Sequence, residues 1–413
     1  MLTDRTGLGE YYSSVCIFLF GVLCLTVDSG YSWGPALLFL AGLILLFRKS
    51  QWPRLKAESS VLVAVLALFF GVWVLDVILR GESASGLDRP SRFLAAIVAF
   101  FWLLRYPPRQ AVFWLCLVVG AFGAAGIAVW ERFVEDAARA SGYNHPIQFG
   151  NLSMMFGLLC LCGAGWAVGQ RNRVVWFCLL FTGFLCGFLA SILSGSRGGW
   201  VSLPFAVLVL YFFYRPWLNK KVMSGIVMAG LVLVAVAYFV PQTGVQDRVM
   251  QVYYDVKLHS EGKVNTPVGT RLEMWKAAAV MIAERPFTGW GQPGYEARME
   301  VFADNGVIDR DILQYNHAHN EFLDITAKRG IGGLLSLLSL YFIPVIVFWR
   351  TIKGEGLKRR SFAAAGAMVC LSYVGFSLSQ SFMSHNSGVM VFAFMLVICA
   401  SLLFADARES RVQ

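Results

Sequence analysis

Charged residues are scarce in this sequence. Asp, Glu, Lys and Arg together make up 15% of its 413 residues, whereas 57% are hydrophobic. Apolar segments long enough to cross a bilayer recur from one end of the chain to the other. This composition excludes a soluble globular class and predicts an integral membrane protein. The sequence also lacks internal repeats and low-complexity tracts.

The cysteines form no recognisable pattern. All nine lie inside apolar segments, and only Cys160 and Cys162 are close neighbours, with no second pair or nearby histidine to complete a metal site. We therefore interpret them as small buried apolar residues. The polar part of the chain has no cysteine, so disulfides cannot hold it together.

We expect an all-α integral membrane protein, because a lipid-facing backbone must satisfy its own hydrogen bonds. The sequence predicts about twelve transmembrane helices, two of them short enough to be re-entrant (33–47 and 92–104). The predicted spans are 11–28, 33–47, 59–79, 92–104, 110–130, 149–168, 174–193, 198–214, 222–240, 331–349, 361–380 and 388–404. They divide the chain into nine helices in 1–240, one large loop in 241–330, and three helices with a short tail in 331–413.

The distribution of Lys and Arg predicts the topology. With both termini inside, the inner loops receive most of the basic residues, including Arg48, Lys49, Arg359 and Arg360. The positive-inside rule therefore places both termini in the cytoplasm and the large loop outside. We attribute the net charge of +10 to this topology and to anionic lipid, and not to nucleic acid. The first apolar segment is expected to be a span and not a cleavable signal peptide.

The large loop carries the first candidate cation. Thr270 and Glu273 have the spacing of a capping box, which predicts a helix that starts at Thr270 and ends before Pro286. Arg271 then stands at the first helical position, where its guanidinium and free backbone N–H groups favour a phosphate. A surface arginine beside its own Glu273 is the plainer alternative. The predicted apolar face of this helix consists of Leu272, Trp275, Ala279 and Ile282.

Arg197 is the second candidate cation. It lies between two apolar segments in Ser194-Gly195-Ser196-Arg197-Gly198-Gly199, and these small residues allow another backbone or a ligand to approach closely. An arginine there either extends to the lipid headgroups or acts as a functional charge within the membrane.

Two histidines, His317 and His319, stand shortly before a long apolar run. Neutral imidazole is the best general base near neutral pH, although a single histidine at a membrane surface is more often structural. If the helix begins at about residue 319, His319 and Gly330 share one face, and Gly330 with Gly333 permits close packing. Metal binding by His317 and His319 is disfavoured, because positions i and i+2 of a helix point apart. Asp309-Arg310-Asp311 has the D-x-D form of metal-dependent transferases, which we interpret as coincidence.

These residues resemble a known family. His319-Asn320, nine residues, and then Gly330-x-x-Gly333 resembles the H-[NSQ]-x9-G-x-x-G signature of bacterial O-antigen ligases, within the wider O-antigen ligase/polymerase superfamily. Ser196-Arg197-Gly198 resembles one arginine site of the superfamily. Its loop pattern is matched by Arg271, Trp275, Ala278, Pro286, Gly289, Trp290, Gly291 and Gly294. Lys328 departs from the pattern, since many relatives carry an acidic residue shortly before the first glycine.

The resemblance implies a periplasm-facing glycosyltransferase of GT-C-like architecture in the bacterial inner membrane. Such an enzyme moves O-antigen polysaccharide from undecaprenyl pyrophosphate to lipid A–core, without cofactor or metal. His319 is the expected general base, and Arg197 and Arg271 are expected to stabilise the pyrophosphate. His317, Asn320 and Arg285 are weaker candidates for substrate contacts.

Other functions remain open. An O-antigen polymerase or a protein O-oligosaccharyltransferase uses the same donor with another acceptor. A transporter of the lipid-linked oligosaccharide is more distant, because transporters tend to carry repeated halves around a polar site at the membrane midplane.

We predict that transfer activity survives chelation of metal ions. A lipid-pyrophosphate donor is already activated, and the large loop shows no convincing set of metal ligands. Transfer should continue unchanged in EDTA. Loss of activity that Mg²⁺ or Mn²⁺ restores, and that Asp309→Ala or Asp311→Ala reproduces, would contradict this prediction.

Overall fold

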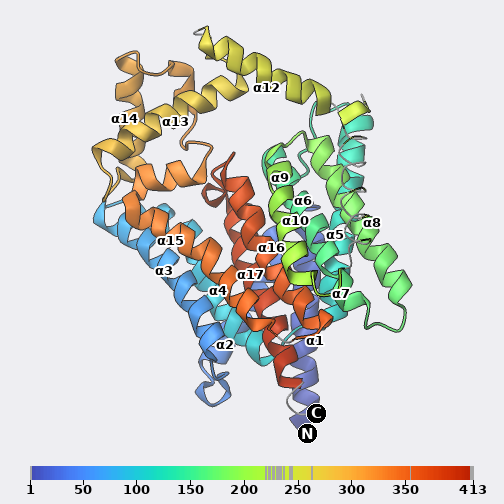
Figure 1. The fold of residues 1–413 in the computed structure, drawn as a ribbon. Coiled ribbons are helices and arrows are strands. Elements are labelled where there is room, and N and C mark those ends of the chain that lie inside the picture. Colours follow the sequence, from blue (N-terminus) through green and yellow to red (C-terminus); the bar gives the residue numbers. More distant parts are fainter. Residues whose placement is uncertain are drawn as a thin grey trace.

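The computed structural model describes residues 2–218, 245–261, 264–353 and 355–409, with isolated positions between 219 and 244. In this part of the chain the regular elements are all helices, as predicted (Figure 1). Their bounds are α1 (Leu2–Leu23), α2 (Trp33–Leu46), α3 (Ala57–Leu79), α4 (Asp88–Arg105), α5 (Gln110–Phe133), α6 (Pro146–Cys162), α7 (Ala164–Ala167), α8 (Arg173–Ser194), α9 (Gly198–Val201), α10 (Leu203–Tyr214), α12 (Val245–Ser260), α13 (Pro267–Glu284), α14 (Gly291–Asp304), α15 (Glu321–Thr351), α16 (Leu357–Ser377) and α17 (Asn386–Glu409).

The apolar segments account for most of these helices. Every predicted span except 222–240 coincides with a helix or with two consecutive helices, and 222–240 lies largely outside the described residues. Six helical segments are long and apolar enough to cross a membrane: Ala57–Leu79, Gln110–Phe133, Pro146–Ala167, Arg173–Ser194, Glu321–Thr351 and Asn386–Ala405. Three further apolar helices are shorter: Gly7–Leu23, Gly30–Leu46 and Gly198–Tyr214. The chain is thus a multi-pass membrane protein, and the total of twelve spans stays a prediction.

The centre of the bundle is formed by α16 and α17. Of the most apolar window of α17, 89% is buried inside the protein, compared with 39% for α3. Small side chains in α16, from Ala363 to Ala367, are completely or almost completely buried and allow its neighbours to approach closely. α6 is also deeply buried, whereas outer helices such as α3 and α8 expose apolar side chains.

The large loop folds into helices with a core of their own. Residues of α13, α14, the short helix Arg310–Gln314 and the start of α15 bury Met274, Met281, Tyr295, Phe302 and Ile312 against each other. Figure 1 shows α12, α13 and α14 across one end of the bundle, here named the loop end. The start of α1 and the turn between α2 and α3 lie at the opposite end (Figure 1), and the side of the membrane that each end faces stays a prediction.

α15 is interrupted at Gly330, which joins the loop end to the bundle. Gly330 has φ 61° and ψ −162°, so the helical hydrogen bonds stop there. The segment before α14 fills the gap: Ile331 N–H donates to Pro286 O at 2.8 Å, and Trp290 N–H donates to Ala327 O at 2.9 Å. The predicted close approach at Gly330 therefore exists, but its partner is the backbone of Phe287 and Thr288, not a second helix.

We predict that Gly330→Ala destabilises the fold and that Gly332→Ala does not. At Gly330 the backbone conformation suits glycine only and costs other residues about 1–3 kcal/mol, and a Cβ would overlap with Phe287 O. A Cβ at Gly332, in the same helix, would meet no atom within 4 Å. Thermal unfolding in detergent measures the difference. Equal unfolding temperatures for the two variants would contradict the strain assigned to Gly330.

Candidate active site

The turn between α8 and α9 packs tightly against α6. Gly195 has φ 64°, and Ser196 Oγ donates to Asn151 Oδ1 of α6 at 2.7 Å. A side chain at Gly150 would overlap with Ser194, so both helices need small residues where they meet. The predicted close approach around Arg197 is thus an approach of α6. Arg197 itself stands at the N-cap position of α9.

α13 begins one turn earlier than predicted. Its N-cap is Thr266, whose side chain accepts from Gly269 N–H at 3.0 Å, and Pro267 is its first residue. The predicted capping box at Thr270 and Glu273 was wrong, because Thr266-Pro267 starts the helix better: proline needs no N–H partner at the first position. Glu273 is 3.0 Å from His259 of α12 and is not the partner of Arg271 that the surface alternative required.

The predicted apolar face of α13 was also partly wrong. Ala279 is exposed, whereas Leu272, Trp275 and Ile282 are half-buried. The buried face follows a different stripe: Met274, Ala277, Ala278 and Met281. This rotation directs Arg271 and Trp275 toward the bundle and the histidine segment, defined here as residues 316–319.

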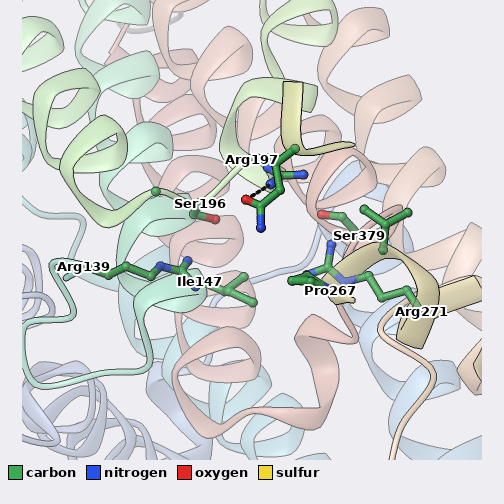
Figure 2. A pocket seen from close by; sticks show the side chains of 11 residues that line it. Arg139, Ile147, Ser196, Arg197, Pro267, Arg271 and Ser379 are labelled. Atoms are coloured by element: carbon green, nitrogen blue, oxygen red, sulfur yellow. Dashed lines mark hydrogen bonds between the residues drawn. The ribbon is translucent and has the colours of Figure 1, made fainter. Parts of the chain in front are cut away.

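Arg197 and Arg271 line one pocket, together with Arg139 from the loop between α5 and α6 (Figure 2). The lining residues are Arg139, Ile147, Gly195, Ser196, Arg197, Gly198, Gln251, Pro267, Val268, Arg271 and Ser379. None of the described lining residues is acidic. Three guanidinium groups around one cavity produce a site for an anion with several oxygens, because each group presents a planar set of donors.

The contacts of these arginines orient them. Arg139 Nε donates to Ser194 O at 2.8 Å, which ties its loop to the α8–α9 turn. Arg197 Nη2 lies 3.4 Å from Gln251 Oε1 of α12. Burial and the positive charge of Arg197 lower the pKa of Arg271. An anion between the two guanidinium groups relieves that repulsion.

The histidine segment is not helical. α15 begins at Glu321, and Asn320 is its N-cap, with Oδ1 accepting from Phe322 N–H at 3.1 Å and Leu323 N–H at 3.2 Å. The prediction of a helix from about residue 319 was therefore wrong, because asparagine caps a helix more readily than it continues one. His319 has φ 50°, a left-handed backbone that turns its ring out of the helical register.

The histidine segment lies next to α13. Trp275 Nε1, one turn after Arg271, donates to Ala318 O at 3.0 Å. His319 is not among the residues that line the pocket, but the charge of Arg271 acts on it. The ring of Tyr315 is 5.3 Å from that of His319. Arg197 and Arg271 thus share a pocket, and His319 lies outside its lining but close enough to Arg271 for the arginine's charge to act on it.

Three imidazoles gather at this point. The ring centroid of His317 is 4.3 Å from that of His319 and 5.6 Å from that of His385. Burial is the first cause that lowers the pKa of His317 and His319 to about 3 and that of His385 to about 4. Neighbouring positive charge is the second cause. Lys328 lowers the pKa of His317, and His317 and Arg271 lower the pKa of His319. The rings are therefore neutral at neutral pH, and Nδ1 of His317 and of His319 has no hydrogen-bond partner in the described part of the chain.

Arg285 lies elsewhere. Its guanidinium stands 3.8 Å from the ring centroid of Trp290, its side chain is exposed, and it does not line the pocket. A contact between Arg285 and the donor stays a prediction, as does a substrate contact by Asn320, whose Oδ1 is engaged in capping.

The D-x-D motif has a local function. Asp309 Oδ1 accepts from Asp311 N–H at 2.9 Å and caps the short helix Arg310–Gln314, while Arg310 pairs with Asp304. Within the described ranges, no three His, Cys, Asp or Glu side chains are placed to share a metal ion.

Several residues at the site carried no signal in the sequence. Arg139 and Gln251 stand in polar stretches without a motif, and Ser379 follows an apolar span. His385 lies 66 positions after His319 in the numbering of the chain, and Gln380, 3.4 Å from His385, stands between two helices. A search for polar residues just outside span ends would have found the last three.

Comparison with known proteins supports the resemblance. A family model described as O-antigen ligase matches residues 181–338, which include Arg197, Arg271 and His319. An uncharacterized protein of Haemophilus influenzae is 24% identical over 394 residues, covering 94% of this chain and 96% of its own length. An O-antigen ligase of Escherichia coli is 24% identical over 139 residues, covering 33% of this chain and 32% of its own length.

We predict that acid destabilises the fold through the three buried histidines. Their pKa values are lower in the folded chain than the ordinary 6.5, so below pH 6.5 the unfolded chain binds protons that the folded chain does not. Each histidine then removes up to about 1.4 kcal/mol of stability per pH unit. Unfolding temperatures in detergent should fall between pH 6.5 and about pH 4, and less steeply for His385→Gln. The same slope for His385→Gln and the wild type would contradict the assignment.

Proposed function

Because this chain is a member of the O-antigen ligase superfamily, we propose that it transfers O-antigen polysaccharide from undecaprenyl pyrophosphate to lipid A–core. The reaction completes lipopolysaccharide at the periplasmic face of the inner membrane. This proposal rests on the pocket lined by Arg139, Arg197 and Arg271, whose described lining contains no Asp or Glu, and on the neutral His319 nearby. A lipid pyrophosphate needs cations and no nucleotide site.

The mechanism is one displacement with inversion. His319 takes the proton of the acceptor hydroxyl, whose oxygen attacks the anomeric carbon of the donor sugar. The bond between that carbon and the pyrophosphate oxygen breaks, and undecaprenyl pyrophosphate leaves with the electron pair. Guanidinium groups stabilise the charge on the leaving oxygens, which is the largest contribution expected at such a site.

The low pKa of His319 links donor binding to catalysis. A base with a pKa of about 3 accepts a proton poorly. Burial is the first cause of that low value and the positive charge of Arg271 is a further one, which a pyrophosphate bound at Arg271 offsets. His319 becomes a stronger base when the donor is present, so the acceptor is activated only in the donor complex.

A reconstituted assay tests the function. Purified protein in lipid is mixed with undecaprenyl-pyrophosphate-linked polysaccharide and lipid A–core, and the product is a lipopolysaccharide of higher mass. Longer lipid-linked chains without lipid A–core would indicate a polymerase instead. Movement of the donor across the bilayer without any product would indicate a transporter.

We predict that His319→Ala abolishes transfer and that Arg197→Lys and Arg271→Lys each impair it severely. Loss of a general base costs about 10²–10⁴-fold, and the point charge of lysine cannot reproduce a bidentate phosphate contact. Arg310→Lys, an exposed arginine in the same loop, is the matched control and should transfer normally. If His319→Ala transfers near the wild-type rate, His319 is not part of the mechanism. If both lysine variants transfer near the wild-type rate, the two arginines have only a structural function.

A further inference from the structure

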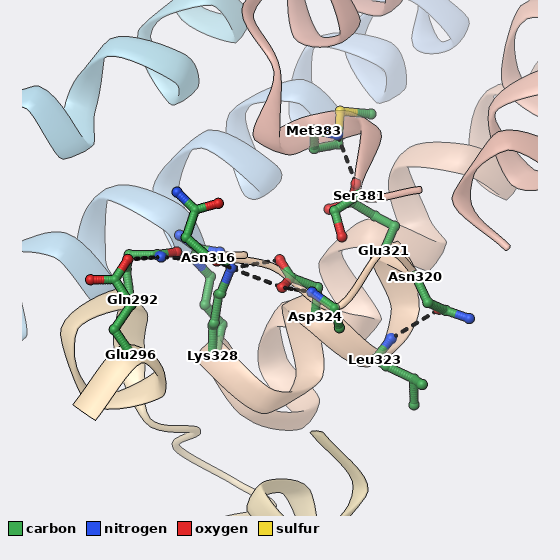
Figure 3. Close-up of polar contacts among 12 residues, drawn as sticks. Gln292, Glu296, Asn316, Asn320, Glu321, Leu323, Asp324, Lys328, Ser381 and Met383 are labelled. Atoms are coloured by element: carbon green, nitrogen blue, oxygen red, sulfur yellow. Dashed lines mark hydrogen bonds and ion pairs between the residues drawn. The ribbon is translucent and has the colours of Figure 1, made fainter. Parts of the chain in front are cut away.

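The histidine segment is held by buried charges at the start of α15. Lys328 Nζ donates to Asn316 O at 3.0 Å and to Asp324 Oδ2 at 2.9 Å. Asp324 Oδ1 accepts from Ala318 N–H at 2.9 Å. Figure 3 shows Asp324 and Lys328 one turn apart on the helix, with Asn316 alongside them. The pair thus bonds the backbone on both sides of His317.

Both charged side chains are almost completely buried. Lys328 is 2% exposed and Asp324 is 3% exposed. Lys328 also lies 4.8 Å from the ring centroid of Tyr295, which covers it from α14. A buried ion pair is weak as a source of stability, because the cost of removing both charges from water roughly cancels their attraction. The bonds that the pair makes to the backbone therefore need their own explanation.

The histidine segment has no secondary structure to satisfy its buried backbone groups. Such groups must find partners, and here the partners are side chains. Trp275 donates to Ala318 O at 3.0 Å, and Gln292 Nε2 donates to Asn316 O at 3.1 Å. Asp324 and Lys328 complete this set, so the position of the segment that carries His317 and His319 is fixed from α13, α14 and α15.

We propose that Asp324 and Lys328 are positioning residues that place His319 for proton transfer by anchoring the backbone of Asn316 and Ala318. This inference rests on the proposed function. A displacement of about 1 Å at a catalytic group can cost about 10²-fold in rate.

An exchange of the two charges separates positioning from charge compensation. The double variant Asp324→Lys with Lys328→Asp keeps the ion pair and the net charge. However, its residue at 324 cannot accept from Ala318 N–H, and its residue at 328 cannot donate to Asn316 O. We expect kcat for transfer to fall by about 10²-fold, with KM for the lipid-linked donor within about twofold, because the arginine pocket is untouched.

Two single variants complete the series. Lys328→Met removes the donor to Asn316 O and keeps the apolar stem, so kcat should fall without a large change in KM. Asp324→Asn keeps an acceptor for Ala318 N–H and should retain more activity than the exchanged pair. Arg310→Met is the matched control, since it removes an exposed ion pair with Asp304 in the same loop and should leave kcat unchanged.

A measurement without substrate keeps this inference distinct from the proposed function. Diethyl pyrocarbonate labels accessible neutral imidazoles, and mass spectrometry reports the extent for each peptide. Labelling at His317 and His319 should rise severalfold in the exchanged pair and in Lys328→Met, with His259 as the internal reference. If the wild type labels as expected but transfers nothing, the proposed function fails alone. Wild-type kcat and wild-type labelling in the exchanged pair would overturn the positioning function.

Discussion

Where α15 breaks at Gly330, the backbone groups on both sides of the break lose their partners within the helix. At the end of a membrane span such groups must be satisfied by other parts of the protein. The segment before α14 does this through Pro286 and Trp290. Arg80, which directly follows α3, holds that segment in turn by donating to Thr288 O at 2.6 Å and to Gly289 O at 3.0 Å. The loop end is therefore bound to the bundle by backbone hydrogen bonds, and the positions of α13, α14 and the histidine segment follow from this attachment.

The acidic residues at the loop end and the arginines of the pocket occupy different places. Three acidic side chains at the loop end are paired with cations: Glu273 with His259, Asp324 with Lys328, and Asp76 with Arg80 and Arg329 at 2.7 Å and 3.3 Å. The arginines around the pocket face no acidic residue of its described lining. The pocket therefore has a local excess of positive charge, to which the large loop contributes Arg271 and other segments contribute Arg139 and Arg197.

Hydropathy predicted the helices well, because lipid and tight helix packing leave little freedom to an apolar segment. Local polar signals were less reliable. Thr270 and Glu273 have capping-box spacing, but Thr266 with Pro267 competes for the same helix start and prevails. His319 was predicted to lie in the helix, but Asn320 caps α15 and leaves His319 outside it. Arg139 and Gln251 carry no local signal, because they come from polar stretches that meet the other site residues only when the bundle forms.

The same tertiary arrangement makes the site electrostatically unfavourable when no anion is bound. Arg197 lowers the pKa of Arg271, and Arg271 lowers that of His319, so the groups repel one another's charged forms. Burial is the first cause of both low pKa values, and an anion in the pocket offsets the contributions of Arg197 and Arg271 that add to it. Any ligand that binds the folded chain alone also stabilises it. Affinity for a polyanion, stability of the loop end and basicity of His319 are therefore coupled, and a change that weakens one of them should be visible in the other two.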